Sequence, residues 1–285
     1  MKVLVTGATG FVGNYVMKEL LAEGHELIAT SFNAEKARQT SWYGSVEYIP
    51  FDLASFHHSI DYFKFFSEPD LLIHLAWEGL PNYKSSFHEE INLPRHLAFL
   101  TNLINNGLQD LSVTGTCLEY GMQEGCLSEN LPCFPANPYA KAKDALRRSL
   151  EQLQEKDPFV LKWIRLFYMY GKGQNPNSLL SQLDKALASG EDQFNMSGGE
   201  QVRDFLPVEK VAEYIVKVAM QRNVTGIINC SSNEPITVKQ FVENYLQSIG
   251  RSIRLNLGYY PYPDYEPMRF WGDNSRLKRV INNEQ

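Results

Sequence analysis

The sequence predicts an α/β fold with a doubly wound parallel sheet, followed by a smaller C-terminal part. Strand-like and helix-like segments alternate through the first 170 residues, which is typical of βαβ units. The predicted strands are continuous apolar runs, as expected when helices cover both faces of a sheet. A glycine-rich turn follows the first of these strands directly.

Each strand and helix of this first part follows from the apolar pattern of its segment. Short apolar runs rich in β-branched residues predict the strands, and apolar residues at helical spacing predict the helices between them. Gly24 and Gly107 end the first two helices. The expected strands are Lys2–Thr6, His25–Thr30, Val46–Pro50, Asp70–Ala76, Asp110–Thr114 and Val160–Phe167, and the expected helices are Phe11–Glu23, Glu89–Asn106 and Tyr139–Gln154.

The chain changes character after Tyr170. Gly171–Asn177 is a polar linker, and one later strand, Gly226–Cys230, resembles the buried strands of the first part. Helical spacing predicts three further helices, Ser178–Ala188, Val208–Gln221 and Val238–Ile249. We therefore expect residues 1–170 and 208–230 to form the sheet domain, and residues 171–207 and 231–285 to form the smaller one.

The composition excludes several classes of protein. Of 285 residues, 44% are hydrophobic and 21% are charged, as in an ordinary globular chain. The net charge of −6 argues against a nucleic-acid-binding protein. The four cysteines and six histidines show no metal-ligand spacing, so no metal site is expected. Without a membrane-spanning stretch or a signal-peptide pattern, the chain is expected to be cytoplasmic, with reduced thiols.

The turn between the first strand and the first helix carries three glycines at spacings of three. Gly7 permits a tight turn, Gly10 lets a pyrophosphate approach the backbone, and Gly13 lets the helix pack closely on the strand. The helix N-terminus offers free N–H groups to phosphates. A ligand-free turn has the same composition, but the position between strand and helix favours a dinucleotide site. The residues expected to form it are Gly7, Thr9, Gly10, Phe11, Val12 and Gly13.

The end of the second strand distinguishes NAD from NADP. A carboxylate there binds the ribose 2′-hydroxyl, whereas a basic residue accepts a 2′-phosphate. The segment contains Ser31 and Asn33, with Lys36 and Arg38 nearby and no carboxylate before position 35, which favours NADP over the alternative, NAD. Two interpretations stay open: Lys36 and Arg38 also suit a solvated helix, and Asp52 either accepts from the adenine amine or caps a turn.

Two residues at the start of the helix 139–154 suggest acid–base chemistry. Tyr139 and Lys143 are four residues apart and therefore share one helix face. A lysine ammonium beside a tyrosine lowers the pKa of the phenol, which is ordinarily near 10. Alone, this spacing better fits a buried tyrosine beside a solvated lysine. Thr116, however, follows the fifth strand at the sheet edge where open α/β folds bind ligands, and its hydroxyl suits a substrate carbonyl.

Together these residues resemble the extended short-chain dehydrogenase/reductase family, and within it the nucleotide-sugar epimerases, dehydratases and reductases. The resemblance covers nearly the whole chain. Beyond the residues above, it includes Asp52-Leu53, His74-Leu75-Ala76, Asn92, Arg165 with Tyr170-Gly171, Arg203-Asp204-Phe205 and Trp271-Gly272-Asp273-Asn274-Ser275.

The resemblance implies a Rossmann fold whose C-terminal part binds a nucleotide diphosphate sugar. It implies that Thr116, Tyr139 and Lys143 are the catalytic set, with Lys143 also bonding the nicotinamide ribose. It also implies a homodimer formed through the helices 89–106 and 139–154. The further cofactor contacts expected from it are Leu53, Leu75, Ala76, Trp77 and Asn92.

The residues after Thr116 separate the reactions of this family. Dehydratases place an Asp-Glu pair there, where this chain has Cys117 and Leu118, and fucose synthases place a cysteine where it has Leu118. Packing is the favoured role of Cys117 over that of a catalytic acid. Simple reduction at C4 and 4-epimerisation remain.

Three features favour reduction. The C-terminal part is short, an exchangeable NADP suits a reductase, and Thr116–Gly121 with Glu266–Arg269 resembles bacterial 4-keto-6-deoxyhexose reductases. The expected reaction is NAD(P)H-dependent reduction of the C4 keto group of a dTDP-, CDP- or GDP-linked 4-keto-6-deoxyhexose, for O-antigen or other surface polysaccharide. The alternatives are a nucleotide-sugar 4-epimerase and a non-catalytic NADP-binding sensor or scaffold.

Several segments are expected to contact the substrate. Trp77 suits either the sugar pocket or core packing, and Asn177 lies where relatives bind the sugar or first phosphate. Arg203 suits the diphosphate or, equally, a surface ion pair with Asp204. Asp264 stands where relatives carry a basic residue, which leaves two arginines as candidates for the second phosphate. The expected contacts are Trp77, Glu78, Thr116, Cys117, Asn177, Arg203, Arg254 and Arg269.

Overall fold

A seven-stranded parallel sheet forms the centre of the computed structural model, which describes residues 1–282. The strand order is β12-β7-β5-β4-β1-β2-β3, and every neighbouring pair is parallel. The predicted α/β sheet is thereby confirmed. Its strands are β1 (Lys2–Thr6), β2 (Glu26–Thr30), β3 (Glu47–Tyr48), β4 (Leu71–His74), β5 (Asp110–Thr116), β7 (Val160–Leu166) and β12 (Gly226–Cys230).

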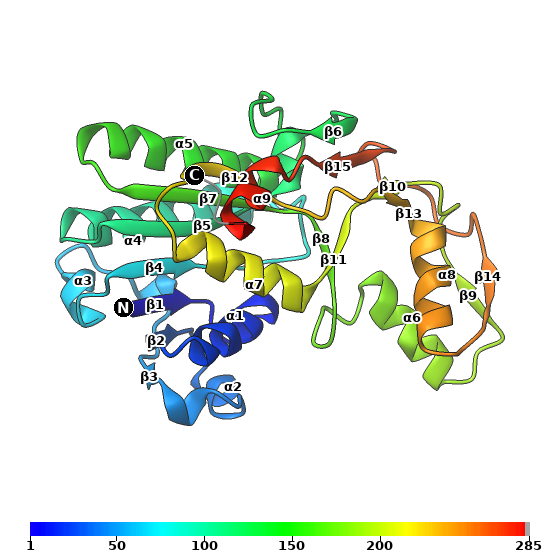
Figure 1. The fold of residues 1–285 in the computed structure, drawn as a ribbon, viewed down its shortest axis with the longest axis horizontal. Helices are drawn as coiled ribbons and strands as arrows, with labels where there is room; N and C mark the ends of the chain where they lie inside the picture. The colour runs from blue at the N-terminus through cyan, green and yellow to red at the C-terminus, as the bar shows by residue number, and fades with distance from the viewer. Residues whose placement is uncertain (283–285) are drawn as a thin grey trace.

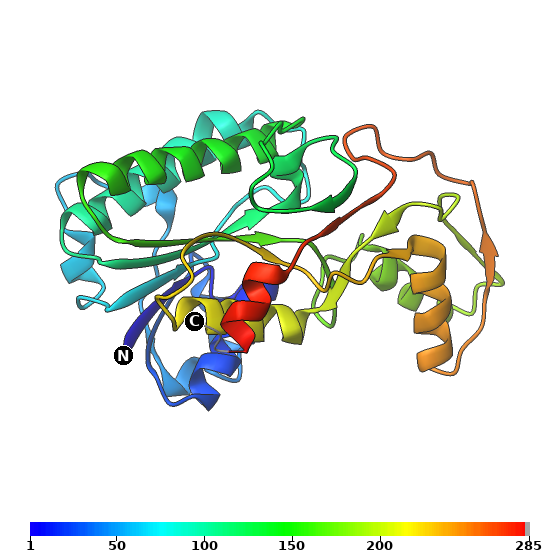
Figure 2. The same ribbon diagram turned by 45° about the horizontal axis from the view of Figure 1, so that its top comes forward.

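Helices cover both faces of this sheet, as Figures 1 and 2 show. On one face lie α1 (Phe11–Ala22) and α7 (Val208–Ala219), and on the other lie α4 (Leu93–Asn105) and α5 (Pro138–Lys156). Each face has its own apolar core, because successive side chains of a strand point to opposite sides. Two short helices complete this part, α2 (Ala34–Arg38) and α3 (Tyr62–Phe65).

The helix expected at 89–106 begins differently from the prediction. Residues His88–Asn92 form a π-turn, and the α-helix starts only at Leu93, with Pro94 in its first turn. Proline has no N–H to donate, so it is tolerated only at a helix start. Among residues 1–282, no helix is both long and apolar enough to cross a membrane.

A smaller part lies beyond the sheet and is built around α6 (Leu179–Ala188) and α8 (Val238–Ser248), with its own apolar cluster (Figure 1). Short strand pairs border it and link it to the sheet. None of these pairs was predicted. They are β9 (Gln193–Asn195) with β14 (Arg254–Asn256), β10 (Val202–Arg203) with β13 (Ile236–Thr237), β8 (Tyr168–Tyr170) with β11 (Phe205–Pro207), and β6 (Gly125–Leu127) with β15 (Phe270–Gly272).

The C-terminal helix α9 (Ser275–Ile281) differs from the expected division of the chain. It lies beside α7 and β12, and its Leu277 and Val280 are buried in the core of the α1–α7 face. Residues 231–285 therefore do not all lie in the smaller part, because this last apolar helix face packs on the sheet domain.

Candidate active site

The carboxyl ends of the central strands border two adjoining cavities of about 190 and 610 Å³. The smaller one, here called the β2 cavity, reaches the end of β2 at Thr30 and Ser31. The larger, here called the β5 cavity, contains the residues that follow β5. The two share Gly7, Gly10, Lys36, Leu75 and Trp77. Both lie at the edge of the sheet where the sequence predicted binding.

The glycine turn is packed too tightly for side chains at two of its positions. Gly7 has φ +69°, and a Cβ on it would lie 2.7 Å from the amide nitrogen of Ala76. A Cβ on Gly13 would lie 2.2 Å from the carbonyl oxygen of Gly7. The first helix can therefore start directly beneath the turn and aim its free N–H groups at both cavities. This cradle fits the pyrophosphate of a dinucleotide.

The β2 cavity has the lining expected of a nucleotide pocket. The predicted contacts that line it are Gly7, Thr9, Gly10, Ser31, Asn33, Leu53, Leu75, Ala76 and Trp77. Phe32 and Phe51 add apolar walls that were not predicted. Phe11, Val12 and Gly13 line the β5 cavity instead.

The polar groups near the end of β2 have partners of their own. Arg38 is exposed and pairs with Glu35, so Lys36 is the cation that borders the cavity. The side chain of Asn33 accepts a hydrogen bond from the amide of Lys36 at 2.9 Å and thus caps α2. Asp52 accepts from the amide of Ala54 at 2.8 Å, which establishes the capping interpretation for this residue.

Thr116, Tyr139 and Lys143 all line the β5 cavity. Tyr139 is placed by the start of α5, where the side chain of Asn137 accepts from the amide of Ala140 and Pro138 occupies the first turn. Burial raises the pKa of Tyr139, and a hydrogen bond with Thr116 opposes the shift. The lowered pKa predicted for this phenol from the neighbouring Lys143 is therefore wrong, because burial dominates, and the phenol keeps its proton at neutral pH.

Lys143 is buried, and the two groups in direct contact with its ammonium, a carbonyl and an indole ring, are neutral. The Nζ atom donates to the carbonyl oxygen of Thr114 at 2.8 Å and lies 4.1 Å from the centre of the Trp77 ring. Burial lowers the pKa of Lys143 to about 7, and the negative charge of Glu119 opposes this shift. The predicted pair of Tyr139 and Lys143 is thus a buried pair beside a cavity.

Trp77 and Asn92 hold the loop that follows β4. The indole Nε1 of Trp77 donates to Nδ1 of His88 at 3.1 Å, so the other ring nitrogen of His88 donates to the carbonyl of Asn82 at 2.9 Å. Asn92 donates to the carbonyl of Glu78 at 2.9 Å. Asn92 borders neither cavity, so the structure places it as a support for Glu78, which lines the β2 cavity.

Arg203 is buried rather than on the surface, and its partner is not Asp204. It lies 2.9 Å from Glu266 and also donates to the carbonyl oxygens of Val202, Pro267 and Met268. The interpretation of a surface pair with Asp204 is wrong. The carboxylate of Asp204 instead accepts from the backbone amides of residues 232 and 233.

The other predicted substrate residues divide into two groups. Trp77 and Cys117 line the β5 cavity, and burial raises the pKa of the Cys117 thiol, so it stays protonated. Three residues are exposed and line neither cavity: Asn177, Arg254 and Arg269. Arg254 bonds Gln193 on the neighbouring strand β9, in the smaller part.

Several lining residues of the β5 cavity were missed by sequence reasoning. They come from irregular segments: Tyr83, Tyr168, Gln174, Asn175 and Glu266. The resemblance of Glu266–Arg269 to the reductases pointed to this segment. Nothing in the sequence indicates, however, that residues 83 and 266 line the same cavity.

Comparisons with known proteins agree with this geometry. The model of the NAD dependent epimerase/dehydratase family matches residues 3–231. The chain is 30% identical over 273 residues to a protein of Aggregatibacter actinomycetemcomitans named dTDP-6-deoxy-L-talose 4-dehydrogenase (NAD(+)), covering 95% of this chain and 99% of that one.

Two solved structures show the same fold. The UDP-N-acetylglucosamine 4-epimerase from Methanobrevibacter ruminantium M1 in complex with UDP-N-acetylmuramic acid has a TM-score of 0.85 and 21% identity, over 98% of this chain and 91% of that chain. The UDP-glucuronic acid 4-epimerase from Bacillus cereus in complex with UDP-glucuronic acid and NAD has a TM-score of 0.83 and 22% identity, over 99% and 93%. With its glycine cradle, its buried tyrosine and lysine and its match to the family model over most of its length, the chain belongs to the NAD-dependent epimerase/dehydratase family.

Proposed function

We propose that the protein catalyses NAD(P)H-dependent reduction of the C4 keto group of a nucleotide-linked 4-keto-6-deoxyhexose. The observation that carries this proposal is the end-to-end match to a protein named dTDP-6-deoxy-L-talose 4-dehydrogenase. Such a dehydrogenase removes a hydride from C4 of a 6-deoxyhexose, and the reverse of that step reduces the corresponding 4-keto sugar.

The residues of the β5 cavity support each part of this reaction. Bound NAD(P)H supplies the hydride that C4 receives. The Thr116 hydroxyl hydrogen-bonds the carbonyl oxygen, and Tyr139 transfers its proton to that oxygen as negative charge develops there. Lys143, fixed on the Thr114 carbonyl, stabilises the phenolate left behind. Water then returns a proton to the phenolate, so each turnover consumes one hydride and one proton.

The protonation state of Tyr139 supports the reductive direction. Burial raises the pKa of this phenol, and the nearby Tyr83 and Glu119 raise it further. The group that must donate a proton therefore carries one at neutral pH. Oxidation of a sugar hydroxyl would instead need the phenolate as a base.

We expect the enzyme to accept both coenzymes. No carboxylate at the end of β2 repels a 2′-phosphate, and Lys36 borders the cavity there, which supports use of NADPH. Arg38 is paired with Glu35, and the matched dehydrogenase is named for NAD(+), which supports use of NADH. Steady-state kinetics with both coenzymes, on the wild type and on Lys36→Ala, test this expectation: the variant loses NADPH turnover selectively if Lys36 binds the phosphate.

The test of the function follows NADH and NADPH oxidation with dTDP-, CDP- and GDP-linked 4-keto-6-deoxyhexoses. We expect oxidation of the coenzyme with at least one of them and formation of the C4 alcohol, identified by NMR. In the reverse direction, dTDP-6-deoxy-L-talose with NAD(+) gives the 4-keto sugar. Absence of coenzyme turnover with every substrate in both directions would overturn the proposal.

A 4-epimerase is the second candidate, and the solved structures are the observation that favours it. The chain spans 91% and 93% of the length of the two epimerases above, so its short C-terminal part argues little against epimerisation. An epimerase retains its NAD and interconverts two nucleotide sugars without net coenzyme consumption. Mass spectrometry of the native protein and a C4-epimer assay distinguish the two activities. A sensor or scaffold would show neither.

We also propose that two chains form a homodimer through α4 and α5. These two long helices pack side by side on one face of the sheet, as in Figure 2. Light scattering after size-exclusion chromatography tests this, with a monomer mass of 32.6 kDa as the outcome that contradicts it.

A further inference from the structure

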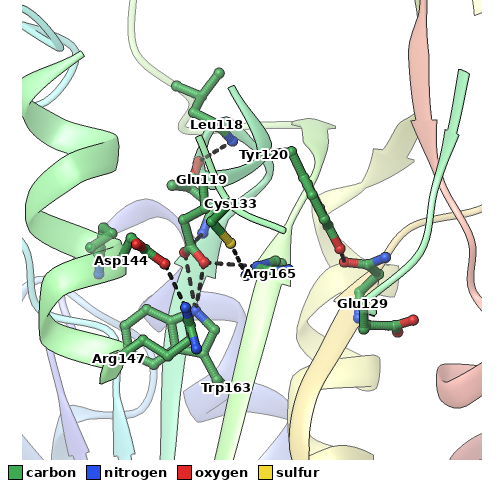
Figure 3. A network of polar contacts seen from close by, with 12 residues as sticks. Leu118, Glu119, Tyr120, Glu129, Cys133, Asp144, Arg147, Trp163 and Arg165 are labelled. Carbon is green, nitrogen blue, oxygen red and sulfur yellow. Dashed lines mark hydrogen bonds and ion pairs between the residues drawn. The ribbon is translucent and has the colours of Figure 1, made fainter. Parts of the chain in front are cut away.

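Glu119 is a buried carboxylate beside the catalytic threonine, and the reaction proposed above does not use it. It is 0% exposed and belongs to the 3-10 turn Cys117–Tyr120 that follows β5. Its oxygens accept from the amide of Thr116 at 2.8 Å, from Nε1 of Trp163 at 3.0 and 3.1 Å, and from Nε of Arg165 at 2.7 Å (Figure 3). One carboxylate thus joins the end of β5 to two side chains of β7.

The carboxylate fits there because residue 115 has no side chain. A Cβ on Gly115 would lie 2.5 Å from Oε1 of Glu119 and 2.2 Å from Nε1 of Trp163. Trp163 and Arg165 are alternate residues of β7 that pair with positions 113 and 115 of β5. The glutamate therefore closes directly over the backbone of the strand that presents Thr116.

This arrangement determines what the Thr116 hydroxyl can do. Glu119 accepts from the Thr116 amide, and Oγ1 of Thr116 accepts from the amide of Leu118 at 3.3 Å, which together form a capping box. The bond from Leu118 orients the Thr116 oxygen, and its hydroxyl hydrogen donates outward, to the Tyr139 oxygen here and to a carbonyl oxygen when substrate is bound. A donor is the form that a substrate carbonyl requires.

The proposed catalytic lysine also holds this stretch of backbone. Lys143 donates to the carbonyl of Thr114, two residues before Thr116. Glu119 lines neither cavity, so it does not touch substrate itself. Glu119 can therefore act on the reaction in two ways: through the backbone of Thr116, which it holds, and through its negative charge, which raises the pKa of both Tyr139 and Lys143.

The charges around Glu119 balance, so the cluster needs no metal ion. Glu119, Cys133 and Asp144 lie close enough to share a cation. Arg165 already contacts Glu119 and lies 2.7 Å from the sulfur of Cys133, while Arg147 pairs with Asp144 at 2.6 Å. Guanidinium groups take the place that a cation would fill (Figure 3).

We propose that Glu119 is a positioning residue: by holding the Thr116 amide against β7, it fixes the Thr116 hydroxyl as a hydrogen-bond donor to the substrate carbonyl. The inference rests on the proposed function only in needing turnover of a nucleotide sugar. Reduction and epimerisation both use the threonine in this way.

The test compares Glu119→Gln with Asp110→Asn. Asp110 forms the matched ion pair at the other end of the same two strands, 2.6 Å from Lys162, and has no contact with either cavity. We expect kcat of E119Q to fall about 30-fold with KM values for sugar and coenzyme within about twofold of wild type. D110N should lower the melting temperature about as much as E119Q does, but should leave kcat within about twofold of wild type.

Two outcomes overturn the positioning role: a folded E119Q with wild-type kcat, or D110N and E119Q losing activity equally. Glu119→Asp separates positioning from charge and also serves if E119Q does not fold: it retains the charge opposite Arg165 but withdraws from the Thr116 amide, and we expect its kcat to fall about tenfold. A folded E119D with wild-type kcat then overturns the inference. A wild type that epimerises, or that shows no turnover, refutes the proposed reduction and not this role.

Discussion

The strand pair β5–β7 has a buried carboxylate–cation pair at each end, and the two ends differ in what surrounds them. At the amino ends, Asp110 lies 2.6 Å from Lys162, whose Nζ also donates to the carbonyls of Ala219 and Gln221 at the end of α7. At the carboxyl ends, Glu119 lies 2.7 Å from Arg165, next to the β5 cavity. One pair joins elements of the core, and the other lies next to residues that line the β5 cavity.

The buried lysines at the two ends make the difference clearer. Burial lowers the pKa of both Lys162 and Lys143, but Asp110 directly opposes the shift at Lys162. Lys143 has a carbonyl oxygen and an indole ring as neighbours, and its pKa falls to about 7. The fold thus pairs the buried lysine at the amino end with a carboxylate and leaves the lysine at the carboxyl end, beside the β5 cavity, without an adjacent one.

The largest expected effect is on activity at the carboxyl end. Tyr139→Phe removes the proposed proton donor with little change in the shape of the side chain, and we expect kcat to fall about 1,000-fold. Steady-state kinetics measure this, with coenzyme binding by fluorescence as the control that should stay unchanged. A variant that binds coenzyme and still turns over at the wild-type rate would contradict the catalytic assignment.

The next effect is on stability at the amino end. Lys162→Met leaves Asp110 buried without its nearest cation, and we expect the free energy of unfolding to fall by about 3 kcal/mol. Urea unfolding followed by circular dichroism gives this number, and kcat of the folded variant should be unchanged. Loss of kcat in folded K162M would show that the two ends are coupled and would break the comparison.

The unpaired lysine predicts a pH dependence of stability. The pKa of Lys143 is about 7 in the folded protein and 10.5 in the unfolded chain, so only the unfolded chain holds the proton between these values. The free energy of unfolding therefore rises from pH 7 to pH 10, by on the order of 3 kcal/mol relative to Lys143→Met. Urea titrations of both proteins in matched buffers measure the difference, and equal slopes would show that Lys143 is not titrating there.

The smallest effect sharpens the description of the amino end. Arg222 also contacts Asp110, at 2.9 Å, but its side chain is 59% exposed. Arg222→Ala should lower the free energy of unfolding by less than about 1 kcal/mol, because solvent screens an exposed pair. Thermal unfolding of R222A beside K162M tests this ranking. An equal loss in both variants would mean that the two cations share the role.

The central sheet could be predicted because each of its strands is a short apolar run that can be recognised from its own residues. Lys2–Thr6 and the glycine turn after it need only neighbouring residues to be recognised. The pair β6–β15 joins Gly125–Leu127 to Phe270–Gly272, and no local pattern encodes such a distant partner.

The same distinction holds for the site. Helix periodicity and strand ends place Thr116, Tyr139 and Lys143 correctly at the β5 cavity. Asn177 was expected there, but Gln174 and Asn175 line the cavity instead, because turns in a linker have no periodicity to fix which residue points inward.

Gly115 makes the substitutions tolerated at positions 115, 119 and 163 depend on one another. A methyl group at 115 would collide with both Glu119 and Trp163. Position 115 therefore accepts only glycine as long as both of these side chains are present. A side chain at this position would need a smaller residue at 119 or 163. Substitutions at these three sites should therefore be strongly epistatic, with only some orders of change passing through a folded, active protein.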